Sequence, residues 1–206
     1  MLDKLENINE DSLILDIGAN VGNISNYLYD KFRPNIICYE PNITCYDYMI
    51  KRFEKKPKIK IFNLAVSNFN GKSNLYFHVK SNGINDVRYI EGATLRPEKD
   101  NIDVRKKIEV ECIDIKKILD KFDKIDLIKI DIEGSEYLIM PEIIKQRNKI
   151  KKVICETHGS PFGKKIFNSE KTKKFMKNEV FKIEYLKLRS KLEEMNLFNN
   201  WFYEWF

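Results

Sequence analysis

Histidine and paired cysteines are scarce in this sequence. Its 206 residues include two histidines and four cysteines, and no two cysteines have the C-x-x-C spacing of a zinc or redox site. Cys38, Cys112 and Cys155 lie within apolar runs, which favours buried free thiols in a reducing compartment. We therefore expect no zinc site and a cytoplasmic location.

Long apolar runs are also missing. We find no stretch of about 20 apolar residues that could cross a membrane, and residues 1–6 are too charged for a signal peptide. With 43% hydrophobic and 33% charged residues, the composition is typical of a globular protein. The length predicts a single domain over residues 1–206.

A net charge of +6 leaves two interpretations open. An acidic partner such as a nucleic acid would need a basic face. Here lysine is spread over most predicted helices, and the densest clusters are Lys164-Lys165 and residues 171–174. We favour a solvated lysine surface and expect no nucleic-acid partner.

Apolar runs alternate with amphipathic segments, which is typical of βαβ units and a parallel sheet. The runs predict strands at 13–17, 36–40, 59–64, 126–132 and 152–156. The amphipathic segments predict helices at about 21–32, 43–55, 114–122, 135–147 and 170–195, with a kink or break at Pro141. The fold class expected is therefore α/β, with helices on both faces of a mostly parallel sheet.

An insertion interrupts this alternation after the third strand. Asn70-Gly71 predicts a hairpin turn, and alternating residues predict strands at 75–79 and 108–112. Between them, residues 81–107 predict a long loop, a lid or substrate-side insert. At the end of the chain, residues 197–206 predict a closing strand whose aromatic residues pack on the domain or on a second copy in a homo-oligomer.

The chain is organised around the stretch from Leu13 to Asn23. A buried strand ends in Asp16-Ile17, and Gly18 and Gly22 follow at positions where the backbone turns sharply or approaches a ligand. A helix begins next and would aim free N–H groups at that ligand. The G-x-x-x-G spacing differs from the dinucleotide fingerprint, so the loop alone predicts either a ligand site or tight packing.

Polar residues stand at the ends of four predicted strands. They are Asp16, Glu40, Asp131 with Glu133, and Glu156 with His158. Ligands of open parallel sheets bind beyond these carboxyl ends. Glu40 follows Gly22 by 18 residues, close to the interval at which an acid accepts hydrogen bonds from ribose hydroxyls.

Five motifs together resemble the FkbM family of methyltransferases. In chain order they are LDIGANVG, CYEPN, NLAVSNFNG, LIKIDIEGSE and VICETHG, from residue 13 to about 159. DIGANVG is shared by many methyltransferases, whereas IDIEGSE with the preceding Lys129 points to this family. The resemblance implies a Rossmann-like fold with the first strand central, and S-adenosylmethionine as cofactor.

The resemblance also implies roles for individual residues. The cofactor would be bound by Asp16, Gly18, Asn20, Gly22, Glu40, Asn42, Ala65 and Val66. Among these, Glu40 would hold the ribose hydroxyls, and Asn42 would either contact the adenosine or only cap the next helix. Lys129, within a buried strand, is expected to pair with a carboxylate.

Methyl transfer to a hydroxyl needs alignment and a base that takes the proton. The candidate catalytic residues are Asp131, Glu133 and His158; carboxylates holding a divalent metal are an alternative that we do not favour. The leading hypothesis is an O-methyltransferase whose acceptor is a small molecule, a sugar or glycan. Two alternatives are a nucleic-acid or protein methyltransferase and a non-catalytic interaction protein on the same fold.

Overall fold

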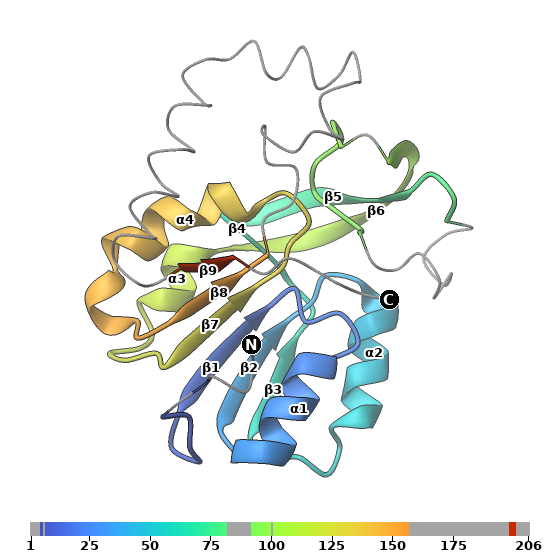
Figure 1. The fold of residues 1–206 in the computed structure, drawn as a ribbon. Coiled ribbons are helices and arrows are strands. Elements are labelled where there is room, and N and C mark those ends of the chain that lie inside the picture. The colour runs from blue at the N-terminus through green and yellow to red at the C-terminus, as the bar shows by residue number, and fades with distance from the viewer. Residues whose placement is uncertain (1–4, 6, 82–91, 100, 157–197, 201–206) are drawn as a thin grey trace.

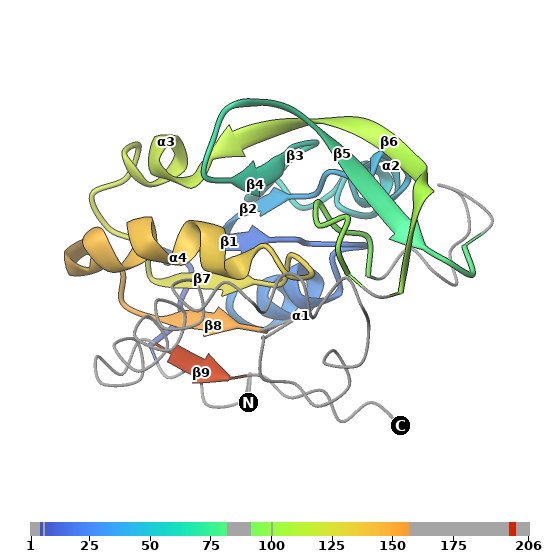
Figure 2. The same cartoon turned by 90° about the horizontal axis from the view of Figure 1, so that it is seen from above.

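A six-stranded parallel sheet forms the centre of the computed structural model, which describes residues 5, 7–81, 92–99, 101–156 and 198–200. Its strands are β1 (Leu13–Ile17), β2 (Asn35–Tyr39), β3 (Ile59–Phe62), β7 (Leu127–Ile130), β8 (Val153–Cys155) and β9 (Phe198–Asn200). They pair in the order β3-β2-β1-β7-β8-β9, and each neighbouring pair is parallel (Figures 1 and 2). The chain changes direction between β1 and β7, so the crevice of the sheet lies there.

Helices cover both faces of this sheet, because alternate residues of its apolar strands point to opposite sides. One face, with Ile14, Ile36 and Leu127, packs against α1 (Asn23–Phe32) and α2 (Ile43–Arg52). The other face, with Leu15 and Ile128, packs against α3 (Ile115–Leu119) and α4 (Glu136–Lys145). The predicted Rossmann-like α/β class, with the first strand inside the sheet, is confirmed.

A second, three-stranded sheet contains the insertion, and here two predictions were wrong. The third predicted strand ends at Phe62, and a separate strand β4 (Ala65–Ser67) follows. β4 and β5 (Gly71–His78) do not form a hairpin, because β6 (Ile102–Asp114) lies between them, parallel to β4 and antiparallel to β5. The turn at Asn70-Gly71 therefore connects two strands that do not pair with each other, since β6 lies between them. Pairing with a strand so distant in the sequence has no local sequence signal.

The predicted loop at 81–107 is shorter than expected. Residues 102–107 belong to β6, and Thr94 forms an antiparallel bridge with Tyr76. This part of β6 has one solvated face, so its basic residues are largely exposed. These charged residues make the segment resemble a polar loop in the sequence. Residues 82–91 and 100 lie outside the described residues.

Other elements keep their predicted positions with shorter bounds. α4 is continuous from Glu136 to Lys145 through Pro141, so the predicted break is absent from this helix. β9 falls within the predicted closing strand. The predicted helix at 170–195, His158 and the aromatic residues 201–206 lie outside the described residues. Within the described part, no helix has the length and apolarity needed to cross a membrane.

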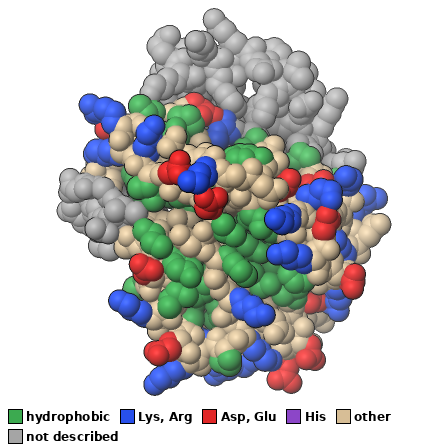
Figure 3. Space-filling view, turned by 180° about the vertical axis from the view of Figure 1, so that it is seen from behind, with side chains coloured by type: hydrophobic (Ala, Val, Ile, Leu, Met, Phe, Trp, Pro, Cys, Tyr) green, Lys and Arg blue, Asp and Glu red, His purple; other side chains and the backbone are tan. Residues whose placement is uncertain are grey.

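All four cysteines are free and buried, as the apolar runs around three of them predicted. Seen from behind, the surface has apolar side chains across its middle, with basic and acidic side chains around them (Figure 3). Charges of both signs are mixed on this face.

Candidate active site

The loop after β1 turns sharply against the ends of its two neighbouring strands. The Gly18 and Ala19 N–H groups both donate to the Tyr39 carbonyl oxygen, at 2.9 and 3.1 Å. Gly18 has φ +76°, and a Cβ atom there would lie 1.8 Å from the Asp131 carbonyl oxygen. Only glycine fits this position, because both the backbone conformation and the close approach exclude a side chain.

A buried ion pair supports this loop. Lys129 Nζ donates to the Gly18 carbonyl oxygen at 2.6 Å and lies 3.3 Å from Asp16 Oδ1 and 3.7 Å from Asp131 Oδ2. Asp16, 1% exposed, also accepts a hydrogen bond from Ser25 Oγ at 2.6 Å. The expected pairing of Lys129 with carboxylates is confirmed, and the lysine connects the ends of β1 and β7.

Glu40 stands just beyond the end of β2. Its Oε2 accepts from the Asn20 N–H and its Oε1 from the Asn42 N–H, both at 2.8 Å. Burial raises the pKa of this carboxyl from 4.5 to about 7, and the two N–H groups partly oppose that rise. Each oxygen keeps a second lone pair, with which the group can accept hydroxyl protons.

Gly22 and Asn42 begin the two helices that follow β1 and β2. Gly22, with φ +77°, packs so tightly that a Cβ atom would lie 2.6 Å from the Phe53 ring. Asn42 Oδ1 accepts from the Thr44 N–H at 3.0 Å, so its capping role is confirmed. Its Nδ2 is buried without a hydrogen-bond partner, so an adenosine contact stays a prediction.

Three acidic residues follow the ends of β7 and β8. Asp131 and Glu156 follow the ends of the neighbouring strands β7 and β8, and the Glu156 N–H donates to the Ile130 carbonyl oxygen at 2.9 Å. Glu133 adopts a left-handed conformation with φ +54°, uncommon for a residue other than glycine. Such strain persists only where surrounding contacts hold it, and it often marks a functional site.

The contacts that hold Glu133 come from residues 92–99, which we call the strap. Thr94 Oγ1 donates to the Glu133 carbonyl oxygen at 2.7 Å, and Lys99 forms an ion pair with the Glu133 carboxylate. Arg96 Nη1 donates to the Gly134 carbonyl oxygen at 3.3 Å. The strap thus lies against the acidic end of the site.

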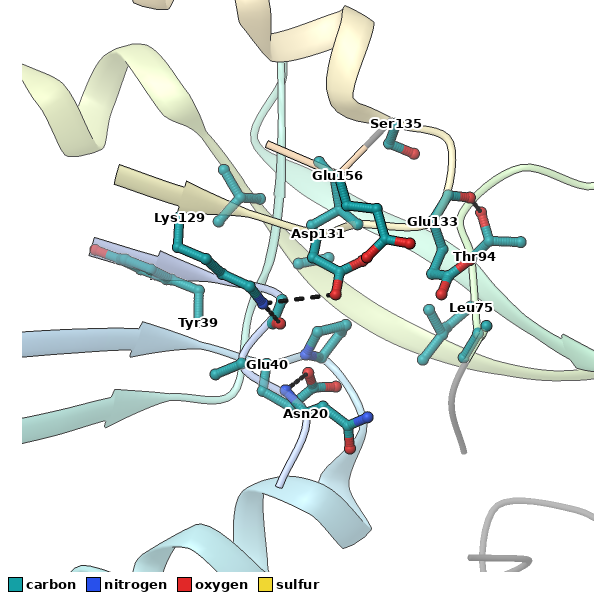
Figure 4. Close-up of a pocket in the computed structure, with 18 of the residues that line it drawn as sticks. Asn20, Tyr39, Glu40, Leu75, Thr94, Lys129, Asp131, Glu133, Ser135 and Glu156 are labelled. Atoms are coloured by element: carbon teal, nitrogen blue, oxygen red, sulfur yellow. Dashed lines mark hydrogen bonds and ion pairs between the residues drawn. The ribbon is translucent and has the colours of Figure 1, made fainter. Parts of the chain in front are cut away.

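These elements surround one cavity of about 770 Å³, within the size range of ligand pockets (Figure 4). Asn20 and Glu40 lie at one end of it, and Asp131, Glu133, Glu156, Ser135 and Thr94 lie toward the other. Ala65, Val66 and Leu75 add an apolar wall from the second sheet. The cavity therefore has the loop backbone and the Glu40 carboxylate at one end, and three acidic side chains at the opposite end.

The structure brings together most of the predicted site residues. Those that line the cavity are Gly18, Asn20, Glu40, Ala65, Val66, Asp131 and Glu133. Asp16, Gly22 and Asn42 do not line it; they hold the loop and the helix starts from behind. His158 lies outside the described residues, so its role stays a prediction.

Other lining residues had no predicted role. Tyr39, Leu75, Thr94 and Ser135 were missed, and Glu156 had been noted only as a polar strand end. The strand pattern could have indicated Tyr39, which ends the apolar run of β2, whereas Leu75 lies within the alternating strand β5, whose pairing is not local. Thr94 and Ser135 had no comparable signal, because they lie in irregular backbone.

The described side chains offer no obvious metal ligand set. No group of three or more His, Cys, Asp or Glu residues in this part of the chain is arranged to hold a metal ion. The cavity lining instead presents hydrogen-bond acceptors and the Lys129 ammonium group.

A parallel sheet with a glycine-containing loop, a buried carboxylate and a cavity at its switch point defines an α/β protein with a candidate ligand site. Comparison with known families identifies its class further: the methyltransferase FkbM domain matches residues 16–196. The chain therefore belongs to the FkbM methyltransferase family. A search of curated proteins finds no match.

Proposed function

We propose that this methyltransferase uses S-adenosylmethionine to methylate a hydroxyl of a small molecule, a sugar or glycan. The observation that carries the proposal is Glu40, whose buried carboxylate is fixed by two backbone N–H groups beside the glycine loop. A fixed carboxylate suits the paired hydroxyls of a ribose, since each oxygen accepts one hydroxyl proton. Ala65 and Val66 provide the apolar contact that an adenine ring requires.

The cofactor supplies an activated methyl group, so the protein's contribution is alignment and proton removal. If the nucleoside part of the cofactor binds at Glu40, the cofactor's methyl group would face the acidic end of the cavity. Bound there, the cofactor would supply its methyl group to the acceptor oxygen, and sulfur would keep the electrons of the broken carbon–sulfur bond. The hydroxyl proton passes to a base, for which Asp131 and Glu133 are the described candidates and His158 is the third.

The polar character of the same end supports a hydroxyl-bearing acceptor. Asp131, Glu133 and Glu156 are hydrogen-bond acceptors, and hydroxyl groups of a sugar are matching donors. The cavity volume of about 770 Å³ exceeds that of a nucleoside alone and leaves room for a second small molecule. The family relationship supports methyl transfer and the acid-lined end supports a hydroxyl acceptor.

Calorimetric titration with S-adenosylmethionine tests the first half of this proposal. We expect the wild-type protein to bind the cofactor and Glu40→Gln to bind at least about tenfold more weakly, because the amide loses one acceptor. Glu109→Gln is the matched control, since Glu109 is exposed on β6 and pairs with Lys72. Absence of binding to the wild type would refute the cofactor assignment.

Release of S-adenosylhomocysteine with a panel of neutral sugars and glycosides tests the second half. Turnover that depends on the sugar supports a hydroxyl acceptor. Turnover only with RNA or with a protein would instead support the alternative acceptors. Binding of the cofactor without turnover of any acceptor class would favour the interaction protein.

A further inference from the structure

Arg52, the last residue of α2, reaches the outside of the glycine loop. Its Nη1 donates to the Val21 carbonyl oxygen at 2.8 Å and to Asn23 Oδ1 at 2.7 Å. Val21 and Asn23 both line the cavity, whereas Arg52 is not among the described residues that line it. Arg52 therefore contacts the ligand site only through other residues.

The loop needs such support because its backbone is irregular. Gly18, Asn20 and Gly22 all have positive φ, at +76°, +52° and +77°. Alternating left-handed residues form no regular hydrogen-bond ladder, so the loop depends on a few isolated backbone hydrogen bonds and on contacts from side chains. Glu40 fixes the Asn20 N–H from the cavity side, and the two bonds from Arg52 fix the next residues from the opposite side.

The guanidinium is itself held in place. Its Cζ atom lies 5.9 Å from the Tyr48 ring centroid and 5.7 Å from that of Phe53, both within the range of cation–π contacts. Phe53 also packs under Gly22, where a Cβ atom would meet its ring. The end of α2 thus touches the loop at consecutive points, with an aromatic ring below Gly22 and a guanidinium beside Val21.

We propose that Arg52 is a positioning residue that holds the cofactor loop in its binding conformation before the cofactor arrives. The inference rests on the proposed cofactor function. Its physical basis is preorganisation: a loop that is already ordered loses less conformational entropy on binding. Hydrogen bonds from a charged donor are stronger than neutral ones, so a single side chain can fix the loop.

Three variants test this role. Arg52→Ala removes both bonds and the stacking, whereas Arg52→Lys keeps the charge but loses the planar guanidinium group. Lys51→Ala removes the same charge from the exposed neighbouring position on α2 and serves as control. The measurements are calorimetric affinity for S-adenosylhomocysteine, and amide hydrogen exchange of residues 18–23 in the protein without cofactor.

For Arg52→Ala we expect affinity for S-adenosylhomocysteine to fall about tenfold or more, with Arg52→Lys between it and the wild type and Lys51→Ala unchanged. In the free protein, the Asn20 and Gly22 amides, which donate to Glu40 and Ala19, should exchange about tenfold faster in Arg52→Ala. Amides of the central strand β7 should keep the wild-type rate. This selective change would separate positioning from a general loss of stability.

Two results would overturn the inference. One is an Arg52→Ala protein whose loop exchanges at the wild-type rate, and this result counts whether or not the wild type binds the cofactor. The other is wild-type affinity for S-adenosylhomocysteine in Arg52→Ala despite faster exchange of the loop. A wild type that does not bind S-adenosylhomocysteine would instead refute the proposed cofactor, and the positioning of a cofactor loop with it.

Discussion

Glu40 should make folding stability and cofactor affinity respond to pH in opposite directions. The pKa of its buried carboxyl is raised from 4.5 to about 7 in the folded protein. Folding therefore favours the protonated form of Glu40. The contribution of this group to the free energy of unfolding is fully present below the unfolded pKa and is lost as pH rises through the folded pKa of about 7. The difference between the two pKa values limits the effect to about 3 kcal/mol.

Between pH 5.5 and pH 8 this linkage predicts that the free energy of unfolding falls by about 2 kcal/mol on account of Glu40 alone. Ribose hydroxyls need the ionised carboxylate as acceptor, so affinity for S-adenosylhomocysteine should rise over the same interval. With a pKa of about 7 in the free protein, the ionised fraction, and with it the affinity, increases by up to about 30-fold.

The assay compares the wild type with Glu40→Gln at both pH values, by urea denaturation without cofactor and by calorimetric titration with S-adenosylhomocysteine. The amide replaces an oxygen that accepts from a backbone N–H, so the variant is less stable overall. We therefore compare how much the stability of each protein changes between the two pH values. This comparison cancels the constant difference in stability and the titration of all groups that the two proteins share. Equal pH dependence of stability in the two proteins, or a wild-type affinity independent of pH, would refute the reasoning.

Three further substitutions test single contacts of the site by urea denaturation. Gly18→Ala should lower the free energy of unfolding by about 3 kcal/mol or more. Gly92 is the control: it also has positive φ but open space around it, so Gly92→Ala should lower the free energy of unfolding by about 1 kcal/mol. Equal losses in the two variants would contradict the close approach at Gly18. Thr94→Val removes the donor to the Glu133 carbonyl oxygen and should lower stability by about 1–2 kcal/mol, while Thr94→Ser should stay near the wild type. Lys129→Met leaves the buried carboxylate of β1 without its ammonium partner and should lower stability by about 3–5 kcal/mol, and a loss below about 1 kcal/mol would exclude the ion pair as a support of the loop.

The main sheet was predictable because local rules determine its strands and helices. Apolar runs such as Leu13–Ile17 are buried on both faces, and this pattern identifies them without knowledge of their neighbours. Pro34 and Pro57 limited the adjoining helices correctly, because proline cannot continue a helix. Pro141 was the exception: α4 contains it, since packing of Ile139, Ile143 and Ile144 against the core stabilises the helix on both sides.

The second sheet was less predictable because its pairing is not local. β4 is only three residues long and lies beside Cys112–Asp114, more than 40 residues later in the chain. A short strand of this kind gives no periodicity over a useful window. The hairpin signal at Asn70-Gly71 is a local rule, and it failed because β6 enters between the two strands that the turn connects.

The same distinction separates the two ends of the cavity. The end at Asn20 and Glu40 is formed by residues that follow two adjacent strands, so a motif of fewer than 30 residues contains most of it. The opposite end joins Thr94 to Glu133, which are 39 residues apart in the chain, and Glu156 also lines it. In the proposed function the acceptor meets the protein at that end, so its identity would depend on side chains that irregular backbone brings together. Substitutions in the strap should therefore alter acceptor choice while affinity for the cofactor, which depends on the other end, stays near the wild-type value.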